Sequence, residues 1–185
     1  AAETEDAAER AASLVHVEFA ELPAVLSGGG ALAPAWPLVQ DPRLRGNVPL
    51  ARTNTMGRWQ FGWGNLDDAA ADIVVENDYS FPMVTPFAIE PHAFLAAPEG
   101  HGVTVWSPTQ HPYVLQRVVA AALRLPIASV RIVSPDPGGG FGGKGWPKFE
   151  PLLAWLALEL GRPVRLVLTL EESFQAARRA SAAIH

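Results

Sequence analysis

The residues best suited to chemistry lie in one glycine-rich loop, Gly138–Gly145, which reads Gly-Gly-Gly-Phe-Gly-Gly-Lys-Gly. Glycine lacks a Cβ atom, so the backbone can adopt positive φ angles and approach another molecule closely. Consecutive backbone N–H groups can also line a concave site for an anion or an oxo group. The loop follows a strand-like run at 130–133 and precedes a helix-like run from Phe149. We therefore interpret it as a cofactor site.

Two nucleotide-binding patterns nearly fit this loop. Gly138 and Gly143-Lys144 have the spacing of a P-loop, but Gly145 occupies the position that requires a magnesium-binding Ser or Thr. The same glycines fit the dinucleotide fingerprint, in which a helix must begin at the loop itself. Here Trp146-Pro147 delays the helix. A non-catalytic nucleotide- or phosphate-binding module that uses Gly138–Gly145 is therefore one alternative, and a purely structural or interaction domain is another.

Four further polar residues are candidates for roles at a site. Glu90 and His92 are two positions apart, so on a strand they would face the same side. Two ligands without a third make a weak metal site, and we expect Glu90 to anchor a neighbouring loop instead. His111 precedes Pro112 and is expected at the start of a helix. Lys144 is a candidate for binding a phosphate or a backbone carbonyl, or for a place on the surface.

The composition limits the class of protein. The chain has 185 residues, of which 49% are hydrophobic and 18% charged, so it can form a sizeable core. A formal net charge of −5 argues against a large nucleic-acid interface. The absence of Cys excludes disulfides and iron–sulfur ligation within this chain, and it fits a reducing compartment. We expect a cytoplasmic protein, or a periplasmic one if a longer N-terminus carries an export signal.

The hydrophobic patterns predict an α+β chain with mixed sheets and packed helices. Helices are expected at 4–13 (with Thr4 as N-cap), 112–125, 149–160 and 171–179, and strands at 15–19, 73–79, 88–96, 103–106, 130–133 and 164–168. Apolar stripes are expected at Val114, Leu115, Val118, Ala122 and Leu125 on one helix and at Leu152, Leu153, Leu156 and Leu160 on the next. Gly161 should end the latter helix.

The chain divides into three parts by pattern. Residues 1–27 and 70–185 contain regular periodicities, whereas 28–69 is an irregular stretch rich in Gly, Pro and Trp. Irregular connections of this length are uncommon inside compact domains and are usually functional or linking. We therefore expect a domain junction at 28–69. Both ends of the chain lack evident start and stop signals, so we expect a piece of a longer polypeptide.

In several short sequence motifs, the chain resembles the xanthine dehydrogenase and aldehyde oxidase family. Pro135–Lys144 is similar to that family's molybdenum-cofactor loop. Five other segments resemble family sequences in the same order: 2–25 the end of the hammerhead domain, 71–76 the entry to the molybdopterin-binding domain, and Glu90–Ala93, Ser107–Pro112 and Gly161–Leu166 further parts of that domain. The resemblance implies that 1–27 is hammerhead-like, that 28–69 is a linker, and that 70–185 begins a molybdopterin-binding domain of the large subunit.

This resemblance implies a molybdenum hydroxylase. Members of the family hydroxylate aldehydes or electron-poor heterocycles with oxygen from water, and the electrons leave through iron–sulfur clusters to a flavin. The implied cofactor is molybdenum–molybdopterin, either as such or as its cytosine dinucleotide. Iron–sulfur clusters and FAD are implied on partner subunits. By matching position, Gln110 corresponds to the Gln that hydrogen-bonds a molybdenum oxygen ligand. The backbones of Phe141 and Gly142 correspond to those lying against the cofactor, and Gly140 and Gly143 allow that approach.

Two departures from the family pattern matter. Xanthine-oxidising members carry a Glu directly after the loop Lys, where this chain has Gly145. An aldehyde or a bulkier aromatic substrate is therefore expected rather than a purine. The family's general-base Glu has no match in this chain, so the resemblance assigns no catalytic residue here and implies that these residues alone are inactive.

Overall fold

The fold is described by a computed structural model that covers residues 1–33, 36–46, 48–65, 71–177 and 180–184. The chain forms two compact units, one made chiefly by Ser80–Ile184 and the other by Ala2–Tyr79. No helix among the described residues is long and apolar enough to cross a membrane.

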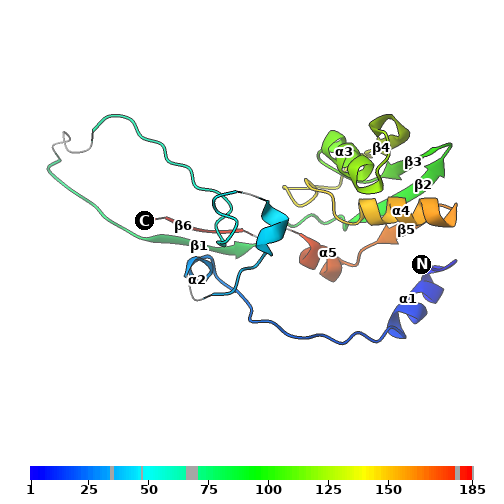
Figure 1. The fold of residues 1–185 in the computed structure, drawn as a ribbon, viewed down its shortest axis with the longest axis horizontal. Coiled ribbons are helices and arrows are strands. Elements are labelled where there is room, and N and C mark those ends of the chain that lie inside the picture. Colours follow the sequence, from blue (N-terminus) through cyan, green and yellow to red (C-terminus); the bar gives the residue numbers. More distant parts are fainter. Residues whose placement is uncertain (34–35, 47, 66–70, 178–179, 185) are drawn as a thin grey trace. The chain divides into compact units, whose positions relative to one another are not determined.

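The larger unit is built on a four-stranded sheet (Figure 1). Its strands are β2 (Ala93–Glu99), β3 (Gly102–Trp106), β4 (Val130–Val133) and β5 (Val164–Val167), in the order β4-β3-β2-β5. β2 pairs antiparallel with β3 and with β5, whereas β3 and β4 are parallel. A parallel neighbour requires a crossover connection, and α3 (Pro112–Leu123) supplies it. A separate two-stranded sheet pairs β1 (Tyr79–Val84) with β6 (Ala180–Ile184).

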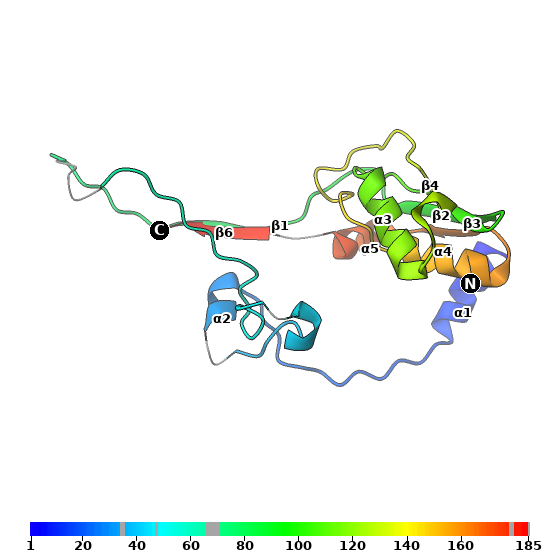
Figure 2. The ribbon, with the colours of Figure 1, turned by 45° about the horizontal axis from the view of Figure 1, so that its top comes forward.

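Two helices pack on the sheet and on each other, α3 and α4 (Glu150–Leu160) (Figure 2). Between them and the sheet lies one core, whose members include Phe94 and Ala96 of β2 and Val103 and Val105 of β3. These alternate residues are at most 3% exposed, as period-two burial on one face of a strand requires. The polar residues of interest lie on the connections at one end of this two-layer sandwich (residues 93–168), where β2 begins and β3, β4 and β5 end.

The helical faces differ from the predicted stripes. On α3 the buried residues are Leu115, Val119 and Ala120, while Val118 is 37% exposed. On α4 they are Glu150, Leu153, Ala154 and Ala157. Of the predicted stripe on α4 only Leu153 is buried, because small alanines allow the helix to approach the sheet, and Leu152 and Leu160 are about half exposed. Gly161 ends α4 at φ 60°, as expected.

The predicted ends of two elements were displaced. β2 begins at Ala93 rather than residue 88, because its pairing with β5 begins there, opposite Val167. The last helix, α5, covers Leu170–Ala176 instead of 171–179; Thr169 and Glu172 form a capping box at its start, and Arg178 and Arg179 lie outside the described residues. The expected starts of β3, β4 and β5 were correct to within one residue.

The smaller unit contains short helices separated by extended chain. α1 (Glu5–Ser13) is capped by Thr4, whose hydroxyl accepts from the Ala7 N–H at 3.2 Å, as predicted. The irregular stretch contains α2 (Gly28–Leu32) and the 3₁₀ helix η1 (Pro42–Arg45). The strand predicted at 15–19 is absent, and at 73–79 only Tyr79 belongs to a strand. Alternating apolar residues form a strand only where a partner strand binds their backbone groups.

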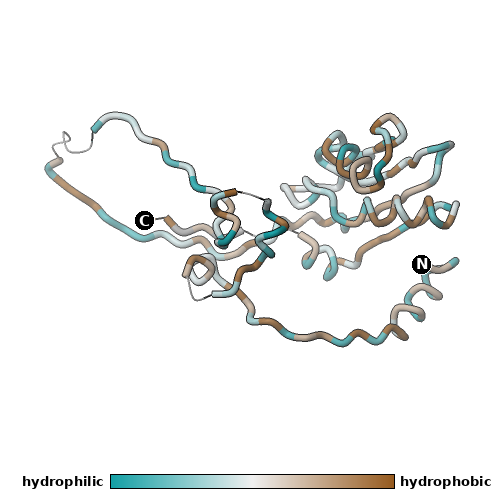
Figure 3. The backbone as a smooth tube through the Cα atoms, in the orientation of Figure 1, coloured by the Kyte–Doolittle hydropathy of each residue, from teal (hydrophilic) through white to brown (hydrophobic). Residues whose placement is uncertain are grey.

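Polar side chains organise the irregular stretch. Arg45 donates from Nη1 to the carbonyls of Leu50 and Thr53, and from Nη2 to that of Thr55 at 2.7 Å. Asn54 donates to the Ala31 and Pro37 carbonyls at 3.0 and 3.1 Å. Hydrophobic residues are nonetheless frequent along this unit (Figure 3), and several are exposed, including Trp59 (77%) and Trp63 (92%).

Candidate functional site

The glycine-rich loop follows β4 and has an unusual backbone. Positive φ angles occur at Gly139 (97°), Phe141 (49°) and Gly142 (81°). A bulky non-glycine residue rarely adopts this conformation, and residues held in it concentrate at ligand sites. The Phe141 side chain is 72% exposed, so burial of the ring does not hold it there. The tip of the loop therefore presents backbone, with one aromatic side chain directed to solvent.

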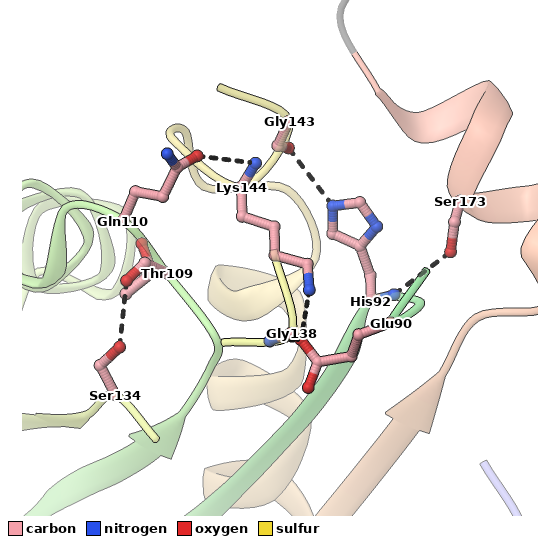
Figure 4. Close-up of polar contacts among 9 residues, drawn as sticks. All are labelled: Glu90, His92, Thr109, Gln110, Ser134, Gly138, Gly143, Lys144 and Ser173. Atoms are coloured by element: carbon pink, nitrogen blue, oxygen red, sulfur yellow. Dashed lines mark hydrogen bonds and ion pairs between the residues drawn. The ribbon is translucent and has the colours of Figure 1, made fainter. Parts of the chain in front are cut away.

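Gln110, in the connection from β3 to α3, contacts the loop directly (Figure 4). Its backbone N–H donates to the Lys144 carbonyl at 3.0 Å, and its side-chain Oε1 accepts from the Lys144 N–H at 3.2 Å. A Cβ atom at Gly140 would lie 2.7 Å from Gln110 Cδ, so a glycine is needed for this close packing. The side-chain nitrogen of Gln110 has no hydrogen-bond partner among the described residues, and Figure 4 shows it directed away from Lys144.

Glu90 holds the loop from the other side. Its Oε2 accepts from the Gly138 N–H at 2.9 Å and from Lys144 Nζ. The Lys144 side chain is only 2% exposed and that of Glu90 is 40% exposed. The hydrogen bond from Lys144, together with the bond from Gly138, lowers the pKa of Glu90 in spite of its partial burial. The carboxylate is therefore charged at neutral pH and matches the buried ammonium.

His92 lies beneath the loop and is 7% exposed. Its Nε2 lies 3.3 Å from the Gly143 carbonyl, and its backbone N–H donates to Ser173 Oγ at 3.2 Å. Burial lowers the pKa of His92, and the neighbouring ammonium groups of Lys148 and Lys144 act in the same direction. The ring is therefore neutral at pH 7 and donates from Nε2, which leaves Nδ1 without a partner among the described residues.

A second polar cluster fixes the chain after the loop. Glu150, at the start of α4, is 3% exposed and accepts from Ser107 Oγ at 2.9 Å and from the Lys148 N–H at 2.6 Å. Lys148 Nζ donates to the Gly143 carbonyl. On the other side, Ser134 Oγ donates to the Thr109 carbonyl at 3.0 Å. Hydrogen bonds thus fix the chain before and after the loop, and Gly143 within it.

The tip of the loop differs from its stem. No acceptor for the N–H groups of Phe141 and Gly142 is present among the residues that the structure describes. Both residues are exposed, and a Cβ atom at Gly142 would meet nothing within 4 Å. Two adjacent N–H donors, fixed in position and open to one side, suit an anionic or oxo oxygen.

The structure brings several of the predicted site residues together. Gln110, Gly140 and Gly143 lie together at the loop stem, whereas Phe141 and Gly142 form its tip. Glu90 anchors the loop, as expected, but Glu90 and His92 lie before β2 and not on a strand. Among the described residues no group of three or more His, Asp or Glu side chains could hold a metal ion.

The expected roles of Lys144 were wrong, because its ammonium is buried against Glu90 and does not face solvent or a carbonyl. A P-loop lysine needs a free ammonium, so this contact also argues against the phosphate alternative. Sequence reasoning missed Lys148, Ser107 and Ser173. The closeness of Lys148 to the loop was a signal for that residue, and Ser107 begins the family-like segment Ser107–Pro112.

The chain is similar to several known proteins. Residues 49–185 match the family model of the molybdopterin cofactor-binding domain. A xanthine dehydrogenase molybdenum-binding subunit of Escherichia coli is 36% identical over 173 residues, which are 92% of this chain and 22% of that protein. The chain thus spans about a fifth of the length of this relative.

Two solved structures share the fold. Quinoline 2-oxidoreductase from Pseudomonas putida superposes with a TM-score of 0.75 at 29% identity, over 97% of this chain and 22% of that one. Aldehyde oxidoreductase from Desulfovibrio gigas gives a TM-score of 0.77 at 26% identity, over 96% and 19% of the two chains. The chain therefore belongs to the molybdopterin cofactor-binding domain family, in the large subunits of the xanthine dehydrogenase and aldehyde oxidoreductase type.

Proposed function

We propose that this chain forms part of the molybdenum-cofactor site of an oxidoreductase that hydroxylates aldehydes or N-heteroaromatic compounds with water. The observation that carries the proposal is the convergence of Gln110 on a loop whose tip offers unpartnered N–H donors at Phe141 and Gly142. These groups are neutral donors, so they can bind oxygen atoms on a metal without changing its charge.

The residues present fit such a cofactor. The side-chain nitrogen of Gln110 and the N–H groups of Phe141 and Gly142 would donate to its oxygen atoms. Gly140 and Gly143 let the loop fold compactly enough for that approach, since a Cβ atom at Gly143 would lie 3.0 Å from the Gly140 carbonyl oxygen. When bound, molybdenum–molybdopterin supplies the two-electron redox chemistry. The role of this chain is to position the cofactor and to hold its polar atoms.

The substrate class follows from Gly145. A side chain at this position would project near Gln110, because a Cβ atom there would lie 3.8 Å from Gln110 Oε1. Gly145 offers no carboxylate to a purine at that place. The relatives described above are named as oxidoreductases of xanthine, quinoline and aldehyde. We favour an aldehyde or an N-heteroaromatic other than a purine.

The remaining assignments extend this proposal to the whole protein. We propose a hammerhead-like part at 1–27, a linker at 28–69 and the start of the molybdopterin-binding domain at 70–185. The cofactor would be molybdenum–molybdopterin, either as such or as its cytosine dinucleotide. Partner subunits would carry iron–sulfur clusters and FAD. The general base would come from outside this chain, so we expect no turnover by these residues alone. The holoenzyme would work in the cytoplasm, or in the periplasm if it is exported.

The test is elemental analysis for molybdenum in the full-length parent subunit, purified with its natural partners from a cofactor-competent host. We expect stoichiometric molybdenum in the native protein and a large loss when Phe141-Gly142 is replaced by Ala-Ala, since alanine is strained at the φ of 81° found at position 142. Absence of molybdenum from the native protein would refute the proposal. Binding of ATP or inorganic phosphate by that protein, measured by calorimetry, would then support the nucleotide-binding alternative.

A further inference from the structure

One carboxylate oxygen holds both ends of the glycine-rich loop. Glu90 Oε2 accepts from the Gly138 N–H, at the first residue of the loop, and from Lys144 Nζ, near its end. Both contacts are drawn in Figure 4. A Cβ atom at Gly138 would lie 2.7 Å from Glu90 Cβ, so the loop begins in direct contact with the Glu90 side chain.

The Lys144 ammonium depends on this contact. Its side chain is 2% exposed, so water cannot replace the carboxylate. The backbone of Lys144 is fixed independently, by its two hydrogen bonds to Gln110. A loss of Glu90 would therefore leave a buried charge on a chain that Gln110 still holds, and the strain would be relieved by opening the loop.

The other contacts do not duplicate this closure. His92 Nε2 and Lys148 Nζ both bind the Gly143 carbonyl, at the end of the loop only. Of the described hydrogen bonds at the loop, the one from the Gly138 N–H to Glu90 is the only one that involves residues 138 or 139. Without it residues 138 and 139 would lose their hydrogen bond, and the tip would move with them as a unit, because its own turn is closed by the bond from the Gly143 N–H to the Gly140 carbonyl at 2.6 Å.

We propose that Glu90 is a positioning residue that closes the glycine-rich loop through Gly138 and Lys144, and so fixes the N–H donors of Phe141 and Gly142. The second clause rests on the proposed function, because those donors would face the cofactor. Closing a loop before binding removes ordering entropy that the ligand would otherwise have to offset. Glu90 itself need not touch the cofactor.

The test uses the full parent subunit with its partners, prepared both with and without the molybdenum cofactor. The variants are Glu90→Ala, which removes both contacts, and Glu90→Gln, whose amide oxygen still accepts hydrogen bonds but carries no charge to match the Lys144 ammonium. Glu159→Ala is the matched control, because Glu159 is exposed on α4. The readouts are hydrogen exchange of the amides at 138–145, molybdenum content, and kcat and KM with a reactive aldehyde.

In the cofactor-free protein we expect exchange at 138–145 to rise about tenfold in Glu90→Ala, and less in Glu90→Gln. Exchange in the strands of the sandwich should change less than about twofold in either variant. In the loaded protein we expect molybdenum content or kcat to fall in the same order, with KM within about twofold of native. Glu159→Ala should match the native protein throughout.

Three results would overturn the inference, and they are separable from a failure of the proposed function. Unchanged loop exchange in Glu90→Ala would refute the closure itself. If Glu90→Ala does not fold, unchanged exchange in Glu90→Gln has the same meaning. A loosened loop with native molybdenum content and kcat would refute the link to the cofactor. If the native protein binds no molybdenum, the proposed function fails, and the cofactor-free exchange data still decide whether Glu90 closes the loop.

Discussion

The sandwich at 93–168 and the stretch at 2–79 have similar shares of apolar residues but use them in opposite ways. The sandwich buries its apolar side chains in one core, with Leu115, Val105 and Ala154 at 0% exposure. No side chain is buried among the described residues of 2–79. There the order comes from helix caps and from the hydrogen bonds of Arg45 and Asn54.

This difference shows which part of the molecule can hold a precise site. A packed core has few alternative arrangements, so loops bonded to it are held in place. The glycine-rich loop and Gln110 both extend from such a core, through β4 and β3. A segment held by hydrogen bonds alone opens more easily, because each bond contributes only about 1 kcal/mol net.

The largest expected effect comes from removing core volume. Leu115→Ala should lower the free energy of unfolding by about 2–5 kcal/mol, because it leaves a cavity in a close-packed core. Leu22→Ala, at a side chain that is 84% exposed, should change it by less than about 0.5 kcal/mol. Urea unfolding of both variants measures the contrast. Equal effects would mean that the smaller unit has a core of its own in solution.

A smaller loss is expected from the polar centre of the 2–79 stretch. Arg45→Ala removes the donors to the carbonyls of Leu50, Thr53 and Thr55. We expect a local opening easier by about 1–3 kcal/mol, measured by hydrogen exchange across 37–55. Arg43→Ala is the control, because Arg43 pairs with Asp41 at an exposed site. Similar exchange in the two variants would contradict the role given to Arg45.

Removal of an N-cap threonine should have different effects on a helix in each of the two regions. Thr4→Ala and Thr169→Ala each remove an N-cap, which costs about 1 kcal/mol. α1 should fray, since none of its residues is buried and an isolated helix of this length is marginal. α5 should persist, because Phe174 stacks on Phe87 at 5.0 Å and Ser173 is buried. Hydrogen exchange of the two helices measures this, and Thr4→Ser should restore α1.

The mildest perturbation is a change of pH. Burial lowers the pKa of His92, so its contribution to stability is present above about pH 6.5 and is lost as the pH falls through the lowered value. The lowered pKa of Glu90 acts in the same direction at more acidic pH: its contribution to stability is lost as the pH falls through the lowered value. The charged groups near His92 are Lys144, Lys148, Glu150 and Glu90. We expect the urea midpoint for unfolding of the sandwich to decrease as the pH is lowered from about 6.5. His92→Gln should remove the part of this decrease that is due to His92.

The sequence predicted the elements of the sandwich well and those of the other region poorly. Strands such as Gly102–Trp106 combine an apolar pattern with a buried place between two neighbours, so pattern and structure agree. At 15–19 the alternation is equally clear, but no partner strand binds it among the described residues. The apolar stripe predicted for α4 was wrong apart from Leu153. Leucine was assumed to be buried, whereas Ala154 and Ala157 face the core.

The site was predictable as far as its residue types allowed. A run of glycines indicates positive φ and close approach, and both occur at Gly139 and Gly140. The anchoring by Glu90 was also expected. The burial of Lys144 was not, since a lysine is usually exposed and its partner lies 54 positions earlier in the chain.

The buried ammonium of Lys144 has a consequence for chemical labelling. The chain contains two lysines: Lys144 Nζ donates to the Glu90 carboxylate, and Lys148 Nζ donates to the Gly143 carbonyl of the glycine-rich loop. Acylating reagents need an unprotonated, accessible amine, so they should modify the chain slowly at Lys144 while the loop is closed. The rate of acetylation at Lys144 would therefore serve as an intrinsic reporter of loop opening, with no dye or engineered residue required.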